Sequence, residues 1–256
     1  MNNTVEITDL SDWEVETLRL TAFVNEEIRP ENITWWNSLF GEEADSTESR
    51  PKQGIRSDEG IFEGGNLKFT SQPSRIDWLY SWKPEEDSEG LPIIGQFDDY
   101  YQKFSLKMIE WLAMSPPIVR LAFGTVLLKP VENREEGYKE LSNFLPDIKI
   151  DAEGSRDFLY QINRPRISKI VAENNIKVNR LSKWSVIRLH RLHITISGDK
   201  SRNIAIPDSG DSACRLELDI STDENISDNL PYEKLADAFS ELVDLGIEIV
   251  VNGDIK

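Results

Sequence analysis

The pattern that most constrains the fold is an alternating strand followed by a long amphipathic helix. Residues 13–24 alternate between two faces, as a half-buried strand does. Residues 97–114 instead repeat large apolar side chains at helical spacing. Ser115-Pro116-Pro117 ends this helix, because proline lacks a backbone donor and disfavours helical geometry in the residue before it. We therefore expect a long helix packed on a sheet.

The other expected elements follow the same two periods. Asn32 can cap a short helix over residues 35–40 that Gly41 ends, and the polar, acidic residues 42–59 predict a solvated loop. Pro165 has no backbone donor, so the strand before it is expected to end there or to lie at a sheet edge. The remaining predicted strands are residues 65–70, 75–82, 157–163, 184–196 and 214–221, and the remaining predicted helices are residues 134–144 and 232–245.

After the proline pair the pattern begins again. Val119-Arg120-Leu121-Ala122-Phe123 echoes Leu18-Arg19-Leu20-Thr21-Ala22-Phe23, and each half ends in a strand, an acidic loop and a long helix. We interpret the chain as two strand–helix–strands–helix units, residues 1–115 and 118–256, which can share one compact domain. Runs of two or three strands between helices predict an α+β fold, with mostly antiparallel strands and two long helices on one face.

Composition is that of a soluble globular protein. Hydrophobic residues make up 39% of the 256 residues and charged residues 29%. The N-terminus has neither the basic nor the apolar stretch of a signal peptide, and the longest apolar stretch, residues 117–128, is too short to cross a membrane. A single cysteine, Cys214, cannot form an internal disulfide and indicates a reducing compartment. We therefore expect a cytoplasmic protein with no membrane partner.

Charge is distributed unevenly along the chain. The net charge is −17, yet residues 164–202 contain ten Lys or Arg against two acidic residues and sum to +8. Such segregation costs self-repulsion unless the fold interleaves the two signs or a partner covers one of them. The candidate binding residues of this segment are Arg164, Arg166, Lys169, Lys177, Arg180, Lys183, Arg188 and Arg191.

Three interpretations of the basic segment, an insertion in the second unit, remain open. Its side chains can pair with acidic residues elsewhere in the protein, which would aid solubility and little else. They can dock an acidic or nucleic-acid partner, although the bulk negative charge opposes steering toward DNA. Alternatively, the acidic remainder is the functional surface and binds a basic protein by imitating nucleic acid.

Catalytic and metal-binding motifs are incomplete in this chain. His190 and His193 would point to opposite faces of a strand, and no carboxylates at ligand spacing accompany them, so we expect no metal site and no cofactor. His193-Ile194-Thr195-Ile196 resembles the His–apolar–Thr–apolar motif of the two-histidine phosphoesterases, but that family needs a second distant copy, which this chain lacks.

A nuclease motif is also incomplete. Pro207-Asp208 followed by Glu217-Leu218-Asp219 resembles the Pro-Asp…Glu-x-Lys nucleases, but Asp219 replaces the lysine that would stabilise the developing charge. An apolar strand face that includes Cys214 and an acidic, solvated face that includes Glu217 explain these residues without catalysis. Neither a phosphate-binding glycine loop nor a serine elbow occurs. Enzymatic activity is therefore unsupported by the sequence.

Seven tryptophans offer a further candidate surface. Trp78, Tyr80 and Trp82 share one strand face, which either packs beneath the 97–114 helix or forms an exposed aromatic platform. Trp35 and Trp36 cannot both be buried in the same direction on a helix, so one of them is a candidate for an interface.

Together these observations favour a non-catalytic interaction protein, a subunit or adaptor of a larger complex whose partner is another protein. The alternative is a nucleic-acid-binding component, with or without nuclease activity, of a bacterial assembly such as a defence system. A second alternative is the acidic mimic of nucleic acid described above.

Overall fold

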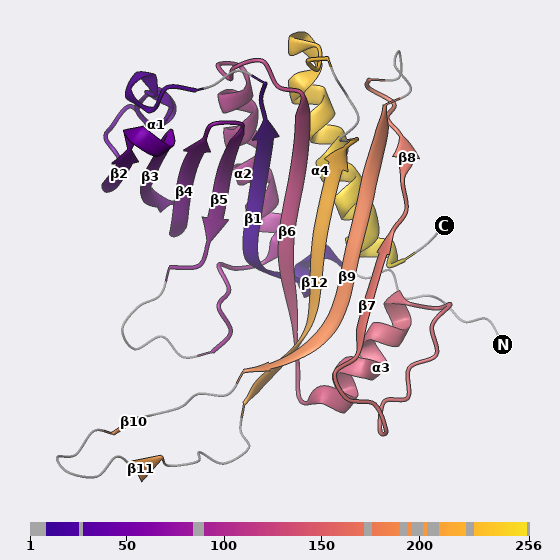
Figure 1. Ribbon diagram of the computed structural model, residues 1–256. Coiled ribbons are helices and arrows are strands. Elements are labelled where there is room, and N and C mark those ends of the chain that lie inside the picture. The colour runs from indigo at the N-terminus through magenta and orange to yellow at the C-terminus, as the bar shows by residue number, and fades with distance from the viewer. Residues whose placement is uncertain are drawn as a thin grey trace.

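One antiparallel sheet takes in almost every strand of the described residues (Figure 1). The computed structural model describes residues 9–25, 28–83, 90–171, 176–189, 194–195, 202–203, 210–223 and 228–254. The strand order is β2-β3-β4-β5-β1-β6-β12-β9-β7, with β8 paired to β9, and all of these pairings are antiparallel. The strands are β1 (Glu14–Phe23), β2 (Ser46–Arg50), β3 (Ile55–Phe62), β4 (Gly65–Gln72), β5 (Arg75–Ser81), β6 (Arg120–Val131), β7 (Leu159–Asn163), β8 (Arg166–Ile167), β9 (Lys177–Leu189) and β12 (Asp211–Thr222), and β10 (Ile194–Thr195) pairs separately with β11 (Arg202–Asn203).

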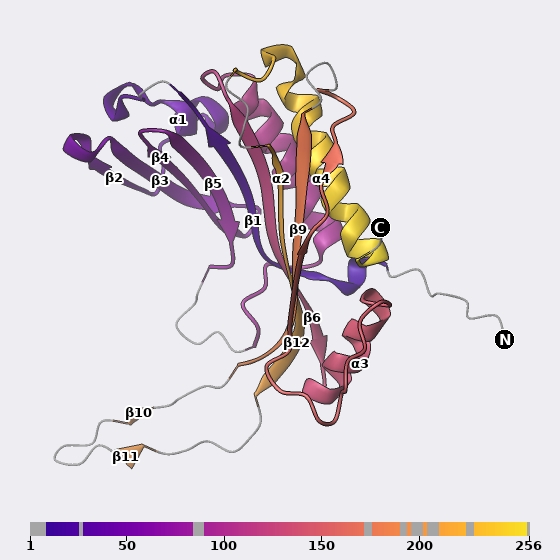
Figure 2. The ribbon, with the colours of Figure 1, turned by 45° about the vertical axis from the view of Figure 1, so that its right-hand side comes forward.

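The described helices lie on one face of the sheet (Figure 2). They are α1 (Trp35–Phe40), α2 (Phe97–Leu112), α3 (Arg134–Phe144) and α4 (Leu235–Asn252). Helix α2 contacts α1, α4 and β1, while α4 packs on β6, β9 and β12. Helix α3 covers the C-terminal end of β9 and the N-terminal end of β12. The predicted α+β class with a mostly antiparallel sheet is therefore confirmed. Among the described helices, none is long and apolar enough to cross a membrane.

Strand periodicity decides which side chains meet the helices. In β1, Leu18, Leu20 and Ala22 are fully buried beneath the helix layer, whereas Thr17 and Arg19 point to the opposite face. β12 repeats this arrangement, with Leu216, Leu218 and Ile220 in the apolar core. The core therefore lies between the sheet and the helices, and the other face is left to polar residues.

The part of the predicted aromatic face that lies in β5 is core and is not a platform, whereas Trp82, just after the strand, is half-buried. Trp78 and Tyr80 are fully buried. Tyr80 stacks on Phe104 of α2 at 6.3 Å, and Trp78 meets Trp111 of the same helix edge-on at 6.1 Å. Aromatic pairs in these arrangements contribute beyond the area that they bury.

The predicted solvated loop over residues 42–59 is wrong, because it contains β2 and most of β3. Strand β2 lies at the sheet edge and all its side chains are exposed, so it has no apolar alternation to reveal it. In β3 an acidic residue occupies a core position. Asp58 is 1% exposed and accepts hydrogen bonds from Thr47 Oγ1 (2.8 Å) and Arg56 Nε (3.0 Å).

Other predicted boundaries shift for similar local reasons. The strand expected at residue 184 begins at Lys177, because Arg180 and Ser182 occupy buried positions and mask the apolar period. Helix α4 continues past the expected stop at residue 245, because Gly246 is a close-packing position against Phe123 rather than a terminator. Thr34, not Asn32, precedes α1, without a side-chain cap. The edge position of β7 before Pro165 is confirmed.

Candidate functional site

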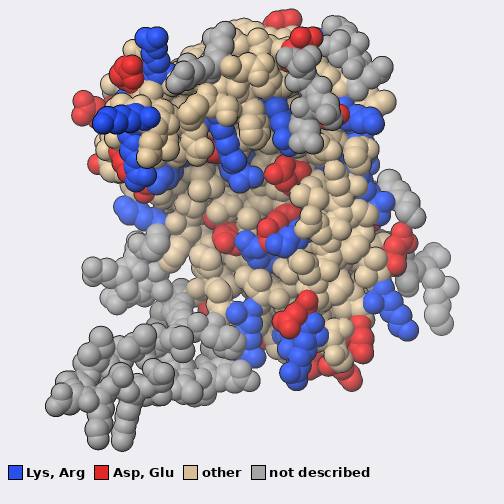
Figure 3. Space-filling view, viewed as in Figure 1, with Lys and Arg blue, Asp and Glu red and all other residues tan. Residues whose placement is uncertain are grey.

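Charged side chains of both signs gather at the centre of the sheet face opposite the helices (Figure 3). They come from β1, β9 and β12, where Arg19, Lys183 and Asp219 are half-exposed. None of the described helices lies over this face (Figure 2). We call it the open face.

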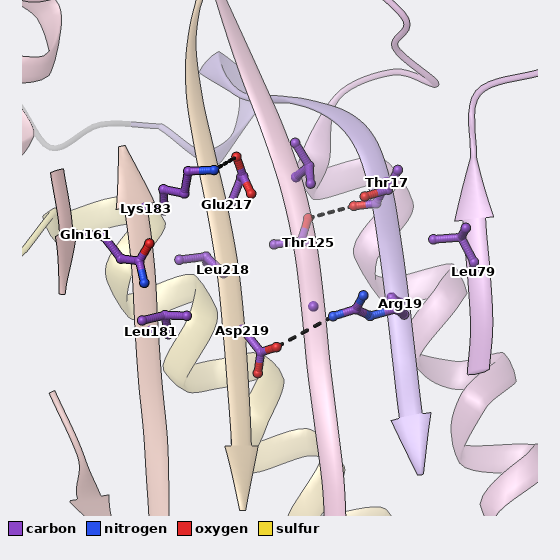
Figure 4. Close-up of a pocket in the computed structure, with 12 residues that line it drawn as sticks. Thr17, Arg19, Leu79, Thr125, Gln161, Leu181, Lys183, Glu217, Leu218 and Asp219 are labelled. Carbon is purple, nitrogen blue, oxygen red and sulfur yellow. Dashed lines mark hydrogen bonds and ion pairs between the residues drawn. The ribbon is translucent and has the colours of Figure 1, made fainter. Parts of the chain in front are cut away.

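A hollow of about 350 Å³ occupies the middle of the open face (Figure 4). Gly124 and Val126 of β6 form its floor, between β1 on one side and β12 on the other. Leu79 of β5 and Leu181 of β9 lie toward its two ends. The hollow therefore combines paired charges at its centre with aliphatic side chains at its margins.

Arg19 lies across β6 because Gly124 has no side chain. A Cβ atom at Gly124 would lie 3.1 Å from Arg19 Nη2 and 3.2 Å from Nε, so the guanidinium rests directly on this backbone. From there Arg19 Nη2 reaches Asp219 Oδ2 of β12 at 3.6 Å, which is longer than a hydrogen bond. Arg19 Nε has no hydrogen-bond partner among the described residues and is closed off from solvent.

The neighbouring charges on the open face are paired more tightly. Lys183 Nζ lies 2.9 Å from Glu217 Oε1, and Arg215 contacts both Glu217 and Glu16. Nearer the other end of β1, Arg75 Nε donates to Asp77 Oδ2 at 2.7 Å, and this bond raises the pKa of Arg75. The pair formed by Arg19 and Asp219 is the loosest of these.

The hollow presents charges of both signs beside aliphatic side chains, which suits recognition of charge and shape. Carboxylates and cations alternate across β1, β12 and β9, and Thr125 Oγ1 is turned to the backbone oxygen of Thr17. Among the described residues, no group of three or more His, Cys, Asp or Glu side chains could hold a metal ion. No protein-family model and no curated protein matches this sequence.

Three of the predicted binding arginines meet at the end of α4, away from the hollow. Arg164 pairs with Asp254, with Nη2 at 2.9 Å from Oδ2, and Tyr160 donates to the same carboxylate at 2.7 Å. Arg166 pairs with Glu248 at 2.7 Å. These contacts tie β7 and β8 to the last turns of α4.

Arg180, the third arginine, is enclosed in this cluster. Its side chain is 2% exposed and lies 3.4 Å from Glu248, the carboxylate that Arg166 also uses. Burial lowers the pKa of Arg180, whereas the hydrogen bond from Arg164 lowers the pKa of Asp254. The cluster thus holds three cations against two carboxylates, and its function in the fold is to fasten α4.

The other predicted residues are scattered. Lys183 lines the hollow, while Lys169, Lys177 and Arg188 are exposed at separate places. Arg191 and both histidines, His190 and His193, lie outside the described residues.

Of the two tryptophans proposed for an interface, one is buried and one is half-buried. Trp36 is 5% exposed and stacks against Trp78. Trp35 packs edge-on against Phe69 and Trp111. The larger part of both rings therefore belongs to the aromatic core under α1 and α2.

Sequence reasoning did not select Arg19, Gly124 or Asp219 as site residues. Their alternation in the strands shows that each belongs to a polar or open face. Their meeting depends on the register β1–β6–β12, in which Gly124 stands opposite both Arg19 and Asp219. That register joins residues 200 positions apart, which no local pattern reveals.

Proposed function

We propose that this protein is a non-catalytic interaction protein, a subunit or adaptor of a larger complex, and that its partner protein docks on the open face. One observation carries this proposal: the helices cover a single side of the sheet and leave the other with a charged hollow at its centre. An antiparallel sheet commonly packs one face on the core and leaves the other accessible, where a partner can dock.

The composition of the hollow supports a protein partner. Protein interfaces combine apolar anchors with charges of both signs that fix orientation. Leu79 and Leu181 provide the apolar part, and Arg19, Asp219 and the Lys183–Glu217 pair provide the charges. A face whose positive and negative charges nearly balance suits a partner that also presents charges of both signs.

Pairing within the basic segment argues against the nucleic-acid alternative. Arg164, Arg166 and Lys183 each contact a carboxylate within 3 Å, so these cations are already neutralised before any phosphate arrives. A filter-binding assay with single-stranded DNA at low salt separates the alternatives. Tight binding that weakens steeply with salt would favour a nucleic-acid-binding protein instead.

Site-specific photo-crosslinking in cells that naturally produce the protein tests the docking proposal. A crosslinking amino acid replaces Gln161 or Leu79 at the hollow, and in the control it replaces Leu106, which is 64% exposed on α2 behind the sheet. We expect a discrete protein adduct from the hollow positions and none from position 106. An equal adduct from all three positions, or none from the hollow, would refute docking on the open face.

We also propose that the two halves of the chain are copies of one unit. The support is the order of elements: β1 and β6 are adjacent at the centre, β5 and β12 flank them, and each flanking strand precedes a long helix, α2 or α4. The helices contain 16 and 18 residues and contact each other. This arrangement is the one that fusion of two strand–helix–strands–helix units would produce.

A further inference from the structure

The structure of the hollow suggests what kind of partner segment it receives, and this inference rests on the proposed function. We infer that the hollow binds an extended protein segment that places a carboxylate on Arg19 and an ammonium or guanidinium group on Asp219. The incoming pair would separate these two side chains and replace one long contact with two short ones.

The first support is the unused bonding capacity of Arg19. A guanidinium has five N–H donors, yet Arg19 makes no hydrogen bond to any other described residue and only the 3.6 Å ion pair with Asp219. Lys183, Arg215 and Arg75 on the same face each lie within 3.2 Å of a carboxylate. Exchanging partners therefore costs Arg19 and Asp219 less interaction energy than it would cost the other charged pairs on this face.

The second support is the sign of the surrounding charge. An isolated anion on Arg19 would lie beside Asp219 and would be repelled by it, whereas Lys183 and Arg215 already offset the charge of Glu217 in the next row of the sheet. A phosphate or a nucleic-acid backbone meets this penalty at each contact. A segment that carries one acid and one base avoids it, because the cation offsets the charge of Asp219.

The third support is the spacing of the charged and apolar side chains across the hollow. In an extended peptide, side chains two residues apart lie on the same side and are separated by roughly 6.6 Å. Such a pair can straddle the Arg19–Asp219 contact, which itself crosses the single strand β6. Leu79 and Leu181 stand beyond the two charges in the same row of the sheet, where they can contact apolar residues that flank the pair.

A blocked tripeptide, acetyl-Glu-Ala-Lys-amide, is the probe for this site. Its titration into isotope-labelled protein is followed by NMR through the side-chain N–H of Arg19 and the backbone N–H of Gly124. We expect saturable shifts of both signals. The matched peptides with Gln in place of Glu or of Lys should bind about tenfold more weakly, since each loses one charge-assisted hydrogen bond.

Protein variants provide the matched controls. Arg19→Gln or Asp219→Asn should weaken binding about tenfold, whereas Arg50→Gln, which alters an exposed pair on the edge strand β2, should not. Unchanged amide spectra outside the hollow verify that each variant is folded. Gly124→Ala, which displaces the Arg19 guanidinium from the backbone, should weaken binding as well.

Three outcomes would overturn the inference. The first is equal binding of the charged and amide peptides, or no shift at all. The second is equal binding by Arg19→Gln and the parent protein. The third is tighter binding of a thymidine oligonucleotide than of the peptide at the same resonances. If a hollow position still crosslinks a protein in cells, only this inference fails, and docking on the open face stands.

Discussion

At the scale of single residues, two glycines determine how closely neighbouring groups approach. Gly124 lets Arg19 lie across β6, as described for the hollow. Gly137 does the same for α3, where a Cβ would lie 2.8 Å and 2.9 Å from the two γ carbons of Val186 in β9. The Cys214 thiol also donates a hydrogen bond to the Gly137 carbonyl at 3.3 Å. At Gly137, helix α3 thus contacts the sheet through its backbone, while Leu141 and Phe144 pack their side chains into the core.

Gly137→Ala should therefore destabilise the protein although alanine is the better helix former. Alanine gains about 1 kcal/mol of helix propensity, but overpacking against Val186 costs roughly 1–3 kcal/mol. We expect a net loss of about 1 kcal/mol in the free energy of unfolding, measured by urea denaturation. The double variant with Val186→Ala should recover part of the loss from the clash. An increase in stability for the single variant would contradict the close packing.

At the scale of elements, α4 is fastened by the basic segment that stood out in the sequence. Ser168 and the backbone N–H of Lys169 bind Glu241, and Arg166 and Arg164 bind Glu248 and Asp254 farther along. Two carboxylates of α4, Glu241 and Glu248, and Asp254 just after its end therefore bind groups from residues 164–169. The segregation of charge along the chain becomes an interleaved pairing in space at this edge.

The pairing of Asp254 predicts a pH dependence of stability. Its pKa in the folded protein lies below the ordinary value of 3.8, so its stabilisation is complete above that value and is lost as the pH falls through the folded pKa. Asp254→Asn should cost about 2 kcal/mol at pH 7, and the difference from the parent should shrink at acidic pH below the ordinary value. Urea denaturation across this pH range measures the difference. A difference that stays constant with pH would contradict the role of the charged pair.

Strands and helices with a clear apolar period could be predicted from the sequence. Strands with polar side chains at core or edge positions could not. The alternation of β1 and β5 and the apolar stripe of α2 place those elements correctly. The polar edge strand β2, the buried Asp58 in β3 and the buried Arg180 in β9 hide their strands, because an exposed edge and polar side chains at core positions remove the apolar alternation. The hollow is concealed for another reason, since its charges meet only through the sheet register.

At the scale of the whole molecule, the two halves of the chain share one sheet and one core. Strand β1 of the first half pairs with β6 of the second over most of its length, and α2 contacts α4. Separating the halves would expose the unpaired edges of both central strands and the apolar residues between the two helices. Each half therefore depends on the other for its buried surface.

Neither residues 1–115 nor residues 118–256 should fold alone, and the two should recover the fold when produced together. The Cys214 thiol reports the outcome, because burial raises its pKa to about 12 and keeps it unreactive in the intact protein. We expect a thiol-specific reagent to label the isolated 118–256 fragment rapidly and the full chain only after unfolding. A slow-labelling fragment that unfolds cooperatively would show that the halves are independent.

The position of the hollow at the seam between the halves has a mechanical consequence. Arg19 and Leu79 come from the first half, and Gly124, Lys183 and Asp219 come from the second. A segment bound there would bridge the seam and act as a clamp, so that pulling the halves apart would also require its release. The two halves therefore form one binding site together, and a substitution in either half alters what that site can bind.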